Sequence, residues 1–194
     1  MTDHAVQLRQ RLADQLSLYV IVEASTPLDV VESLLEAGVG TIQLREKRLP
    51  PAEQVPAARK LQALCRQKGA LFVVNDSVDV ALASGADGVH LGRDDEAVAA
   101  ARRRMGADKV VGATERSPED AVRAQRDGAD YLGVGPIYPS QTKMARPPAG
   151  PELIARIRQV TVLPIVGIAG IGPGRAAPVI AAGADGVAVI SAIL

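Results

Sequence analysis

One short junction recurs four times along this chain, and each time a glycine separates a helical stretch from an apolar one. The four copies are Ala37-Gly38-Val39-Gly40, Ser84-Gly85-Ala86-Asp87, Asp127-Gly128-Ala129-Asp130 and Ala182-Gly183-Ala184-Asp185. Glycine after a helix supplies the left-handed residue that ends it, and the short runs that follow have the valine, isoleucine and leucine of buried strands. The spacing leaves room for one more strand and helix between successive copies. Eight strand–helix units are therefore predicted, and these close naturally into a (β/α)8 TIM barrel.

The eight strands are predicted at apolar runs that alternate with helical stretches along the chain. They lie near Leu18 to Val22, Thr41 to Leu44, Leu71 to Val74, Val89 to Leu91, Val110 to Ala113, Tyr131 to Val134, Leu163 to Ile168 and Val187 to Ile190. Several of the intervening helices should begin near a proline, where the missing N–H costs least. The whole chain, 1–194, is expected to form a single domain.

Both ends of the chain depart from a plain barrel. Leu8, Leu12 and Leu16 recur every four residues and predict a short amphipathic helix over 1–17, which would cover the barrel floor below the strands of 18–194. The sequence stops three residues after Ser191, so the eighth helix is expected to be missing or truncated. Apolar surface beside the first and eighth strands should then be exposed unless another subunit or the N-terminal helix covers it. A homodimer or a fragile monomer is therefore predicted.

Composition excludes several classes of function. The 22 basic and 22 acidic residues cancel, so no overall field favours nucleic acid or an anionic membrane. The single cysteine, Cys65, cannot form an internal disulfide and suits a reducing compartment, so a cytoplasmic location is expected. The charged first 17 residues lack the apolar core of a signal peptide. The longest apolar tract, Val160 to Ile171, is too short to span a bilayer.

Charged and polar side chains follow several of the predicted strands, and a barrel brings such residues together at one rim. Arg45, Lys47 and Lys143 are cations there, and Asp76 and Asp95 are carboxylates. Mg²⁺ prefers one or two carboxylates together with phosphate oxygens and water, so this set predicts a Mg²⁺ site that binds a diphosphate. Glycine-rich backbone after the seventh and eighth strands predicts a second site, for a monophosphate.

The rim also lacks the residues of nucleophilic catalysis. Cys65 is expected within a helix, His4 lies near the N-terminus, and His90 falls inside a strand, where it is expected to be a hydrogen-bonded core or rim residue. No Ser-His-Asp or Cys-His arrangement is recognisable. A reaction that only ionises a carbon–diphosphate bond needs electrostatic stabilisation instead. Asp87, Asp130 and Asp185 recur with the junction and are expected to be structural.

Five motifs in order between Leu18 and Ile193 resemble those of the thiamine phosphate synthase family. They are Gln43-Leu44-Arg45-Glu46-Lys47, Val74-Asn75-Asp76, Gly88-Val89-His90-Leu91-Gly92, Gly133-Val134-Gly135-Pro136-Ile137-Tyr138-Pro139 with Thr142-Lys143, and Ala182-Gly183-Ala184-Asp185-Gly186-Val187. The resemblance implies a TIM-barrel transferase that uses Mg²⁺ and joins hydroxymethylpyrimidine diphosphate to thiazole phosphate, giving thiamine monophosphate and diphosphate. It implies a dissociative mechanism, in which diphosphate leaves, a pyrimidine methyl cation forms, and the thiazole nitrogen captures it.

The same resemblance implies a role for each matching residue. Arg45, Lys47, Asn75 and Lys143 would contact the pyrimidine diphosphate and carry catalysis, and Asp76 and Asp95 would bind Mg²⁺. Gln43, Ser140 and Thr142 would line the substrates, and Thr114 would offer a hydroxyl. Gly170, Ile190 and Ser191 would hold the thiazole phosphate through backbone N–H groups.

Some positions depart from the family pattern and keep two alternatives open. Thr114 stands where the family usually has serine, and Ala169 stands where a pair of glycines is usual. One alternative is a relative that resembles thiazole tautomerases, which use a histidine where this chain has Arg116. The other is a catalytically silent barrel that binds a phosphorylated ligand.

Overall fold

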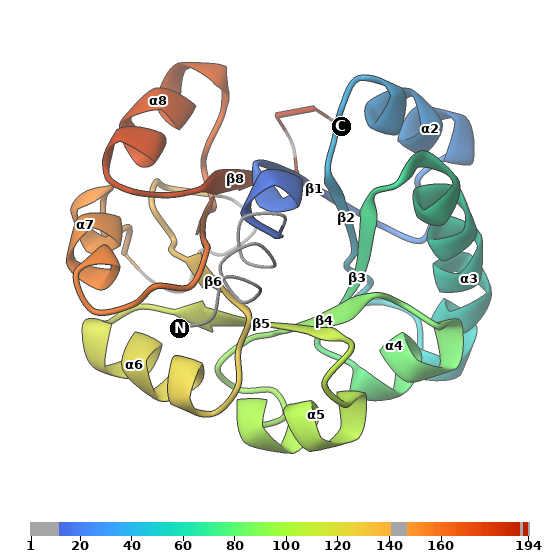
Figure 1. The fold of residues 1–194 in the computed structure, drawn as a ribbon. Helices are drawn as coiled ribbons and strands as arrows, with labels where there is room; N and C mark the ends of the chain where they lie inside the picture. The colour runs from blue at the N-terminus through green and yellow to red at the C-terminus, as the bar shows by residue number, and fades with distance from the viewer. Residues whose placement is uncertain (1–11, 141–146, 191, 194) are drawn as a thin grey trace.

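The structure is a computed structural model that describes residues 12–140, 147–190, 192 and 193, and its strands close into a barrel (Figure 1). The strands are β1 (Leu18–Val22), β2 (Thr41–Leu44), β3 (Leu71–Asn75), β4 (Gly88–Leu91), β5 (Val110–Glu115), β6 (Tyr131–Val134), β7 (Ile165–Ile168) and β8 (Gly186–Val189). All pairs are parallel, and β8 pairs back onto β1. The predicted barrel is confirmed, with strand ends shifted by no more than two residues.

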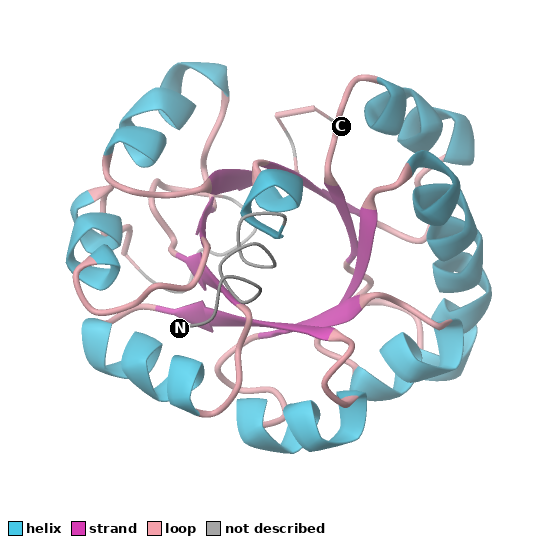
Figure 2. Cartoon of the chain, in the orientation of Figure 1, coloured by secondary structure: helices cyan, strands magenta, loops and turns pink. Residues whose placement is uncertain are grey.

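Helices form a ring outside the strands (Figure 2). They are α2 (Leu28–Glu36), α3 (Pro51–Lys68), α4 (Val78–Ser84), α5 (Val98–Met105), α6 (Pro118–Arg126), α7 (Glu152–Arg158) and α8 (Pro173–Ala181). Prolines stand in the first turns of α3, α6 and α8, where the free N–H groups of a helix lie. Ser117 caps α6, because its hydroxyl oxygen accepts a bond from the Asp120 N–H at 3.1 Å.

The four junction glycines have the left-handed backbone that was predicted for them. Gly38, Gly85, Gly128 and Gly183 have φ angles of 96°, 73°, 99° and 105°. The aspartates of the last three copies are structural, as expected, since each accepts a bond from the backbone N–H of a residue in a neighbouring strand. The pairs are Asp87 with Phe72 at 2.9 Å, Asp130 with Val111 at 2.8 Å and Asp185 with Ile165 at 2.7 Å. The repeated motif therefore ends a helix and ties the next turn to the sheet.

Residues 12–16 form a helix at one end of the barrel (Figure 1), and residues 1–11 of the helix predicted over 1–17 lie outside the described residues. The Gln15 carbonyl accepts a bond from the Thr41 hydroxyl at 2.8 Å, at the start of β2. Leu16 is fully buried and packs with Tyr19 and Tyr131 inside the barrel. The helix therefore blocks the end where the strands begin, and the opposite end is left for a site.

The expectation of an exposed apolar surface beside β1 and β8 is wrong. The valines of these strands are buried: Val20, Val22, Val187 and Val189 are 0%, 1%, 8% and 7% exposed. They belong to the same core cluster as Val31 of α2 and Val179 of α8, and α8 lies in contact with β8. No helix follows β8 in residues 192 and 193, the last that the structure describes. The homodimer remains a prediction, but exposed apolar surface beside β1 and β8 no longer supports it.

Cys65 lies on α3 and is fully buried, which confirms its packing role. Burial raises the pKa of its thiol to about 12, so the side chain behaves as a small apolar group.

Among the helices of the described ranges, none is both long enough and apolar enough to cross a bilayer.

Candidate active site

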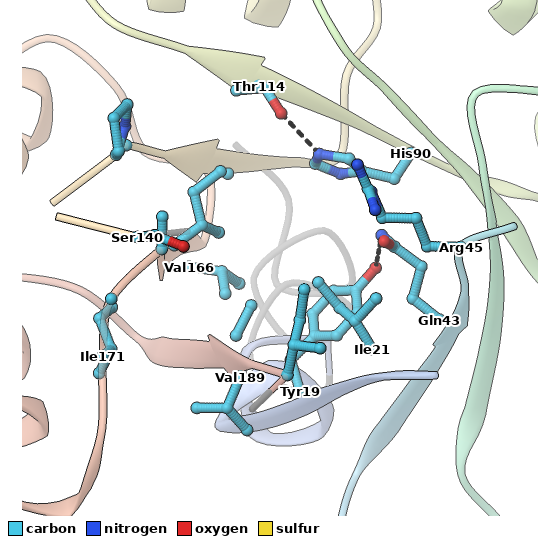
Figure 3. Close-up of a pocket in the computed structure, with 18 of the residues that line it drawn as sticks. Tyr19, Ile21, Gln43, Arg45, His90, Thr114, Ser140, Val166, Ile171 and Val189 are labelled. Carbon is cyan, nitrogen blue, oxygen red and sulfur yellow. Dashed lines mark hydrogen bonds between the residues drawn. The ribbon is translucent and has the colours of Figure 1, made fainter. Parts of the chain in front are cut away.

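A cavity of about 1020 Å³ opens at the end of the barrel where the strands finish (Figure 3). It brings together every predicted site residue that the structure describes: Gln43, Arg45, Lys47, Asn75, Asp76, Asp95, Thr114, Ser140, Gly170 and Ile190. Thr142, Lys143 and Ser191 lie outside the described residues. Thr114 was expected after its strand but lies within β5, with its hydroxyl in the cavity wall.

Two carboxyl groups meet at one wall of the cavity. Asp76 follows β3 and has a left-handed φ of 66°, a conformation that aspartate tolerates better than most residues. Asp95 follows β4, and one of its oxygens accepts a bond from the Gly92 N–H at 2.6 Å. The two side chains are hydrogen-bonded to one another. The turns after neighbouring strands thus produce an acidic pair.

The pKa values of the two carboxyl groups are shifted in opposite directions. Burial raises the pKa of Asp95, and the hydrogen bond to Asp76 and its negative charge raise it further. Burial acts on Asp76 in the same sense, but hydrogen bonds to Asp95 and Lys47 outweigh it, and the pKa of Asp76 is lowered. The two carboxyl groups therefore lose their protons in separate steps, as expected for like charges in contact. A divalent cation between them would offset the repulsion of the two carboxylates.

The donor set of the pair fits Mg²⁺. Within the described ranges, no cluster of three or more histidine, cysteine or acidic side chains is formed, so Asp76 and Asp95 stand as a pair. Mg²⁺ is commonly held by one or two carboxylates, and its other positions are filled by water and substrate phosphate. Lys47 forms an ion pair with Asp76 and is half exposed, which leaves its ammonium group accessible to an anion.

Cations surround the acidic pair. Arg45 and Lys47 come from the end of β2, where they were predicted. Arg93, Arg116 and Arg175 also line the cavity, although they were not among the predicted site residues. Their positive charge favours a ligand with several negative charges, such as a diphosphate with its metal ion.

The turn after β7 forms another part of the wall. Ala169 and Gly170 have successive left-handed φ angles of 71° and 68°. A Cβ on Gly170 would lie 2.5 Å from the Pro139 carbonyl oxygen, so this position requires glycine. Arg175 donates to the Gly170 carbonyl at 3.0 Å and lies 5.0 Å from the centre of the Tyr138 ring. Ala169 therefore adds a methyl group to a turn that is otherwise fixed, at a conformational cost of about 1 kcal/mol.

The cavity is also lined by Tyr19, His90 and Tyr131, which were not predicted as part of the site. They sit on β1, β4 and β6 with their side chains inside the barrel. His90 was expected to be a hydrogen-bonded core or rim residue, and it does bond to Tyr131 and Thr114. Alternation along each strand could place these side chains on the inner face, but only the barrel register shows that they meet.

Glu115 ends β5 between two cavity-lining residues and is only 8% exposed. Burial and the negative charge of nearby Asp120 raise its pKa from 4.5 to about 7. The folded state thus holds this proton more tightly than the unfolded state does. The stability that this proton provides is complete at pH values below the pKa of Glu115 in the unfolded protein. It is lost as the pH rises through the pKa of Glu115 in the folded protein.

We expect Glu115→Gln to remove this pH dependence, because glutamine cannot ionise. Relative to wild type, the free energy of unfolding of the variant should increase by about 2 kcal/mol between about pH 5 and about pH 8. Urea unfolding at the two pH values measures the difference. If the difference in the free energy of unfolding between variant and wild type were the same at both pH values, the expectation would be contradicted.

Comparisons with known proteins agree with this geometry. Residues 18–193 match the family model "Thiamine monophosphate synthase". The chain is 57% identical, over 94% of its length, to the thiamine biosynthesis bifunctional protein ThiM/ThiE of Symbiobacterium thermophilum, of which it spans only 38%. It is 44% identical to the thiamine-phosphate synthase of Bacillus licheniformis, covering 95% of this chain and 86% of the relative. A solved thiamine phosphate pyrophosphorylase from Pyrococcus furiosus has a TM-score of 0.83 and 38% identity, over 93% of this chain and 88% of that one. The chain therefore belongs to the thiamine monophosphate synthase family.

Proposed function

We propose that this protein is a thiamine-phosphate synthase that joins 4-amino-2-methyl-5-hydroxymethylpyrimidine diphosphate to thiazole phosphate. The products would be thiamine monophosphate and diphosphate. The observation that carries the proposal is the convergence of Asp76 and Asp95 with Arg45 and Lys47 in one cavity, in a chain of this family. A pair of carboxylates beside cations suits a diphosphate that binds together with a divalent metal ion.

The acidic pair and the cations would bind the pyrimidine diphosphate. Asp76 and Asp95 would hold Mg²⁺, which when bound supplies positive charge to the leaving diphosphate. Arg45, Lys47 and Asn75 line the same cavity and would donate to its phosphate oxygens. Lys143, outside the described residues, is proposed for the same role.

The second substrate would lie toward the turns after β7 and β8. Gly170 and Ile190 line that part of the wall, and with Ser191 they are proposed to donate backbone N–H groups to the thiazole phosphate. Gln43, Thr114, Ser140 and Thr142 are proposed to line the substrates between the two phosphate sites.

The proposed reaction is dissociative and needs no protein nucleophile. The C–O bond to the diphosphate breaks, its electron pair leaves with the diphosphate, and a pyrimidine methyl cation remains. The thiazole nitrogen then donates its lone pair and forms the new C–N bond. Arg45 and Lys47 would stabilise the negative charge that develops on the leaving oxygen, the main electrostatic requirement of such a step.

We expect the purified protein to release diphosphate and to form thiamine monophosphate when both substrates and Mg²⁺ are present. Chelation of the metal with EDTA should slow diphosphate release by about 10²-fold or more, because the charge of the leaving group is then no longer neutralised. A coupled diphosphate assay measures the rate, and added Mg²⁺ should restore it. Product formation at an unchanged rate after chelation would contradict the metal-assisted mechanism. Binding of the thiazole phosphate without any turnover would instead favour the silent barrel.

A further inference from the structure

A continuous chain of hydrogen bonds runs across the barrel through residues that line the cavity. The Gln43 amide Nε2 donates to the Tyr19 hydroxyl at 2.7 Å, and the Tyr19 and Tyr131 hydroxyl oxygens are 2.9 Å apart. The Tyr131 hydroxyl lies 2.9 Å from Nδ1 of His90, and Nε2 of His90 lies 2.8 Å from the Thr114 hydroxyl. Figure 3 shows the two ends of this chain as dashed lines, from Gln43 to Tyr19 and from His90 to Thr114. We call these five residues the relay.

The relay is buried, and its two phenols keep their protons. Tyr19, Tyr131 and His90 are 2%, 0% and 7% exposed. Burial raises the pKa of both tyrosines far above their ordinary value of 10.0. Each tyrosine hydroxyl therefore has one proton to donate, and a buried donor without an acceptor would be costly.

With Nε2 of Gln43 donating to Tyr19, one arrangement of protons gives every donor in the relay an acceptor. Because the Tyr19 oxygen accepts from Gln43, the Tyr19 proton must go to Tyr131. The Tyr131 proton then goes to Nδ1 of His90, which must carry its own proton on Nε2. That proton is donated to the Thr114 oxygen. The hydrogen bonds thus all run in one direction, from Gln43 to Thr114.

This direction decides what the two ends offer to a ligand. The Gln43 amide uses Nε2 inside the relay, so its Oε1 is the atom that can accept from a ligand. Thr114 accepts from His90, so its own hydroxyl proton can be donated to a ligand. An isolated glutamine could rotate its amide by half a turn and present the donor instead. In the relay such a flip would require all four bonds to reverse.

We propose that Tyr19, Tyr131 and His90 are positioning residues that hold Gln43 as an acceptor and Thr114 as a donor. This proposal rests on the proposed function, in which the ligand is an aminopyrimidine. An amino group on the ring donates to the Gln43 oxygen, whereas an oxo group at the same place would set two acceptors against each other. The relay would therefore select a 4-amino pyrimidine diphosphate against its 4-oxo analogue.

The tautomer of His90 tests the relay without any substrate. The chain has two histidines, His4 and His90, so a His4→Gln variant leaves only the ring signals of His90 in a ¹⁵N-histidine NMR spectrum. We expect the neutral ring with its proton on Nε2 and with Nδ1 unprotonated. A ring protonated on Nδ1 would mean that the bonds run from Thr114 to Gln43, and it would overturn the proposal.

Substrate selection tests the positioning role. Tyr131→Phe keeps the ring, against which Gly112 packs, but it removes two bonds of the relay. The ratio of kcat/KM for the 4-amino substrate to that for the 4-oxo analogue should fall by about tenfold, the worth of one hydrogen bond. Tyr138→Phe is the matched control, since its ring contacts Arg175 outside the relay, and its ratio should equal that of wild type.

The two measurements separate the possible failures. A wild-type protein that forms no product would refute the proposed function, while the His90 tautomer would still decide the direction of the relay. An active wild type with an unchanged selection ratio in folded Tyr131→Phe would overturn the positioning role alone. Thermal unfolding of both tyrosine variants shows whether each is folded at the assay temperature.

Discussion

Replacing Asp76 by asparagine should slow diphosphate release by a factor of about 10² to 10³, while the protein stays folded. The substitution keeps the size of the side chain and its left-handed backbone, with a φ of 66°, which asparagine also tolerates. It removes the negative charge that would bind the metal ion beside Asp95. The lost ion pair with Lys47 is partly exposed and should cost less than about 1 kcal/mol of stability.

Asp79→Asn is the matched control for this experiment. Asp79 lies three residues further along, in α4, where its side chain is 78% exposed and pairs with Arg104. The same change of charge there should leave the rate of diphosphate release within about twofold of wild type. Steady-state diphosphate assays at saturating Mg²⁺ measure both variants. Equal rates for Asp76→Asn and wild type would remove the acidic pair from the mechanism.

Gly112→Ala should strongly destabilise the barrel interior. A Cβ at this position would lie 2.2 Å from Cζ and 2.5 Å from the hydroxyl oxygen of Tyr131. Tyr131 is fully buried and held by bonds to Tyr19 and His90, so its ring has no room to retreat. Overpacking of this kind costs about 3 kcal/mol or more. Urea unfolding of the variant and wild type measures the loss.

Gly174→Ala provides the corresponding control in the first turn of α8. No atom lies within 4 Å of the Cβ that this change would add. Alanine is the better helix former, so the free energy of unfolding should be unchanged or higher by up to about 1 kcal/mol. If Gly112→Ala were as stable as Gly174→Ala, the close packing of Tyr131 against β5 would be refuted.

The shape of the barrel could be predicted because its signals are local. A glycine such as Gly85 ends a helix through its own backbone, and the apolar run that follows forms a strand because both faces of a parallel sheet are covered. Asp76 and Asp95 could be predicted to meet for a related reason. Residues that follow neighbouring parallel strands always lie at the same end of a barrel.

The burial of β1 and β8 was mispredicted because it depends on side chains that lie far from these strands in the sequence. The sequence predicts that the helix after β8 is missing or truncated, but it does not show which side chains cover the two strands. In the structure Val187 and Val189 pack in one core with Val31 and Val179, and little apolar surface is left open. Packing of this kind involves residues far apart in the chain.

The sequence by itself determined the eight strands, the end of the barrel that carries the charges, and the carboxylate pair, since each follows from local turn chemistry and from the strand order. Only the tertiary structure decided that Tyr19, His90 and Tyr131 form one chain of hydrogen bonds from Gln43 to Thr114. These residues lie on five different strands. Their contact depends on the register and closure of the barrel, because a shift of one residue along a strand would turn its side chain to the other face.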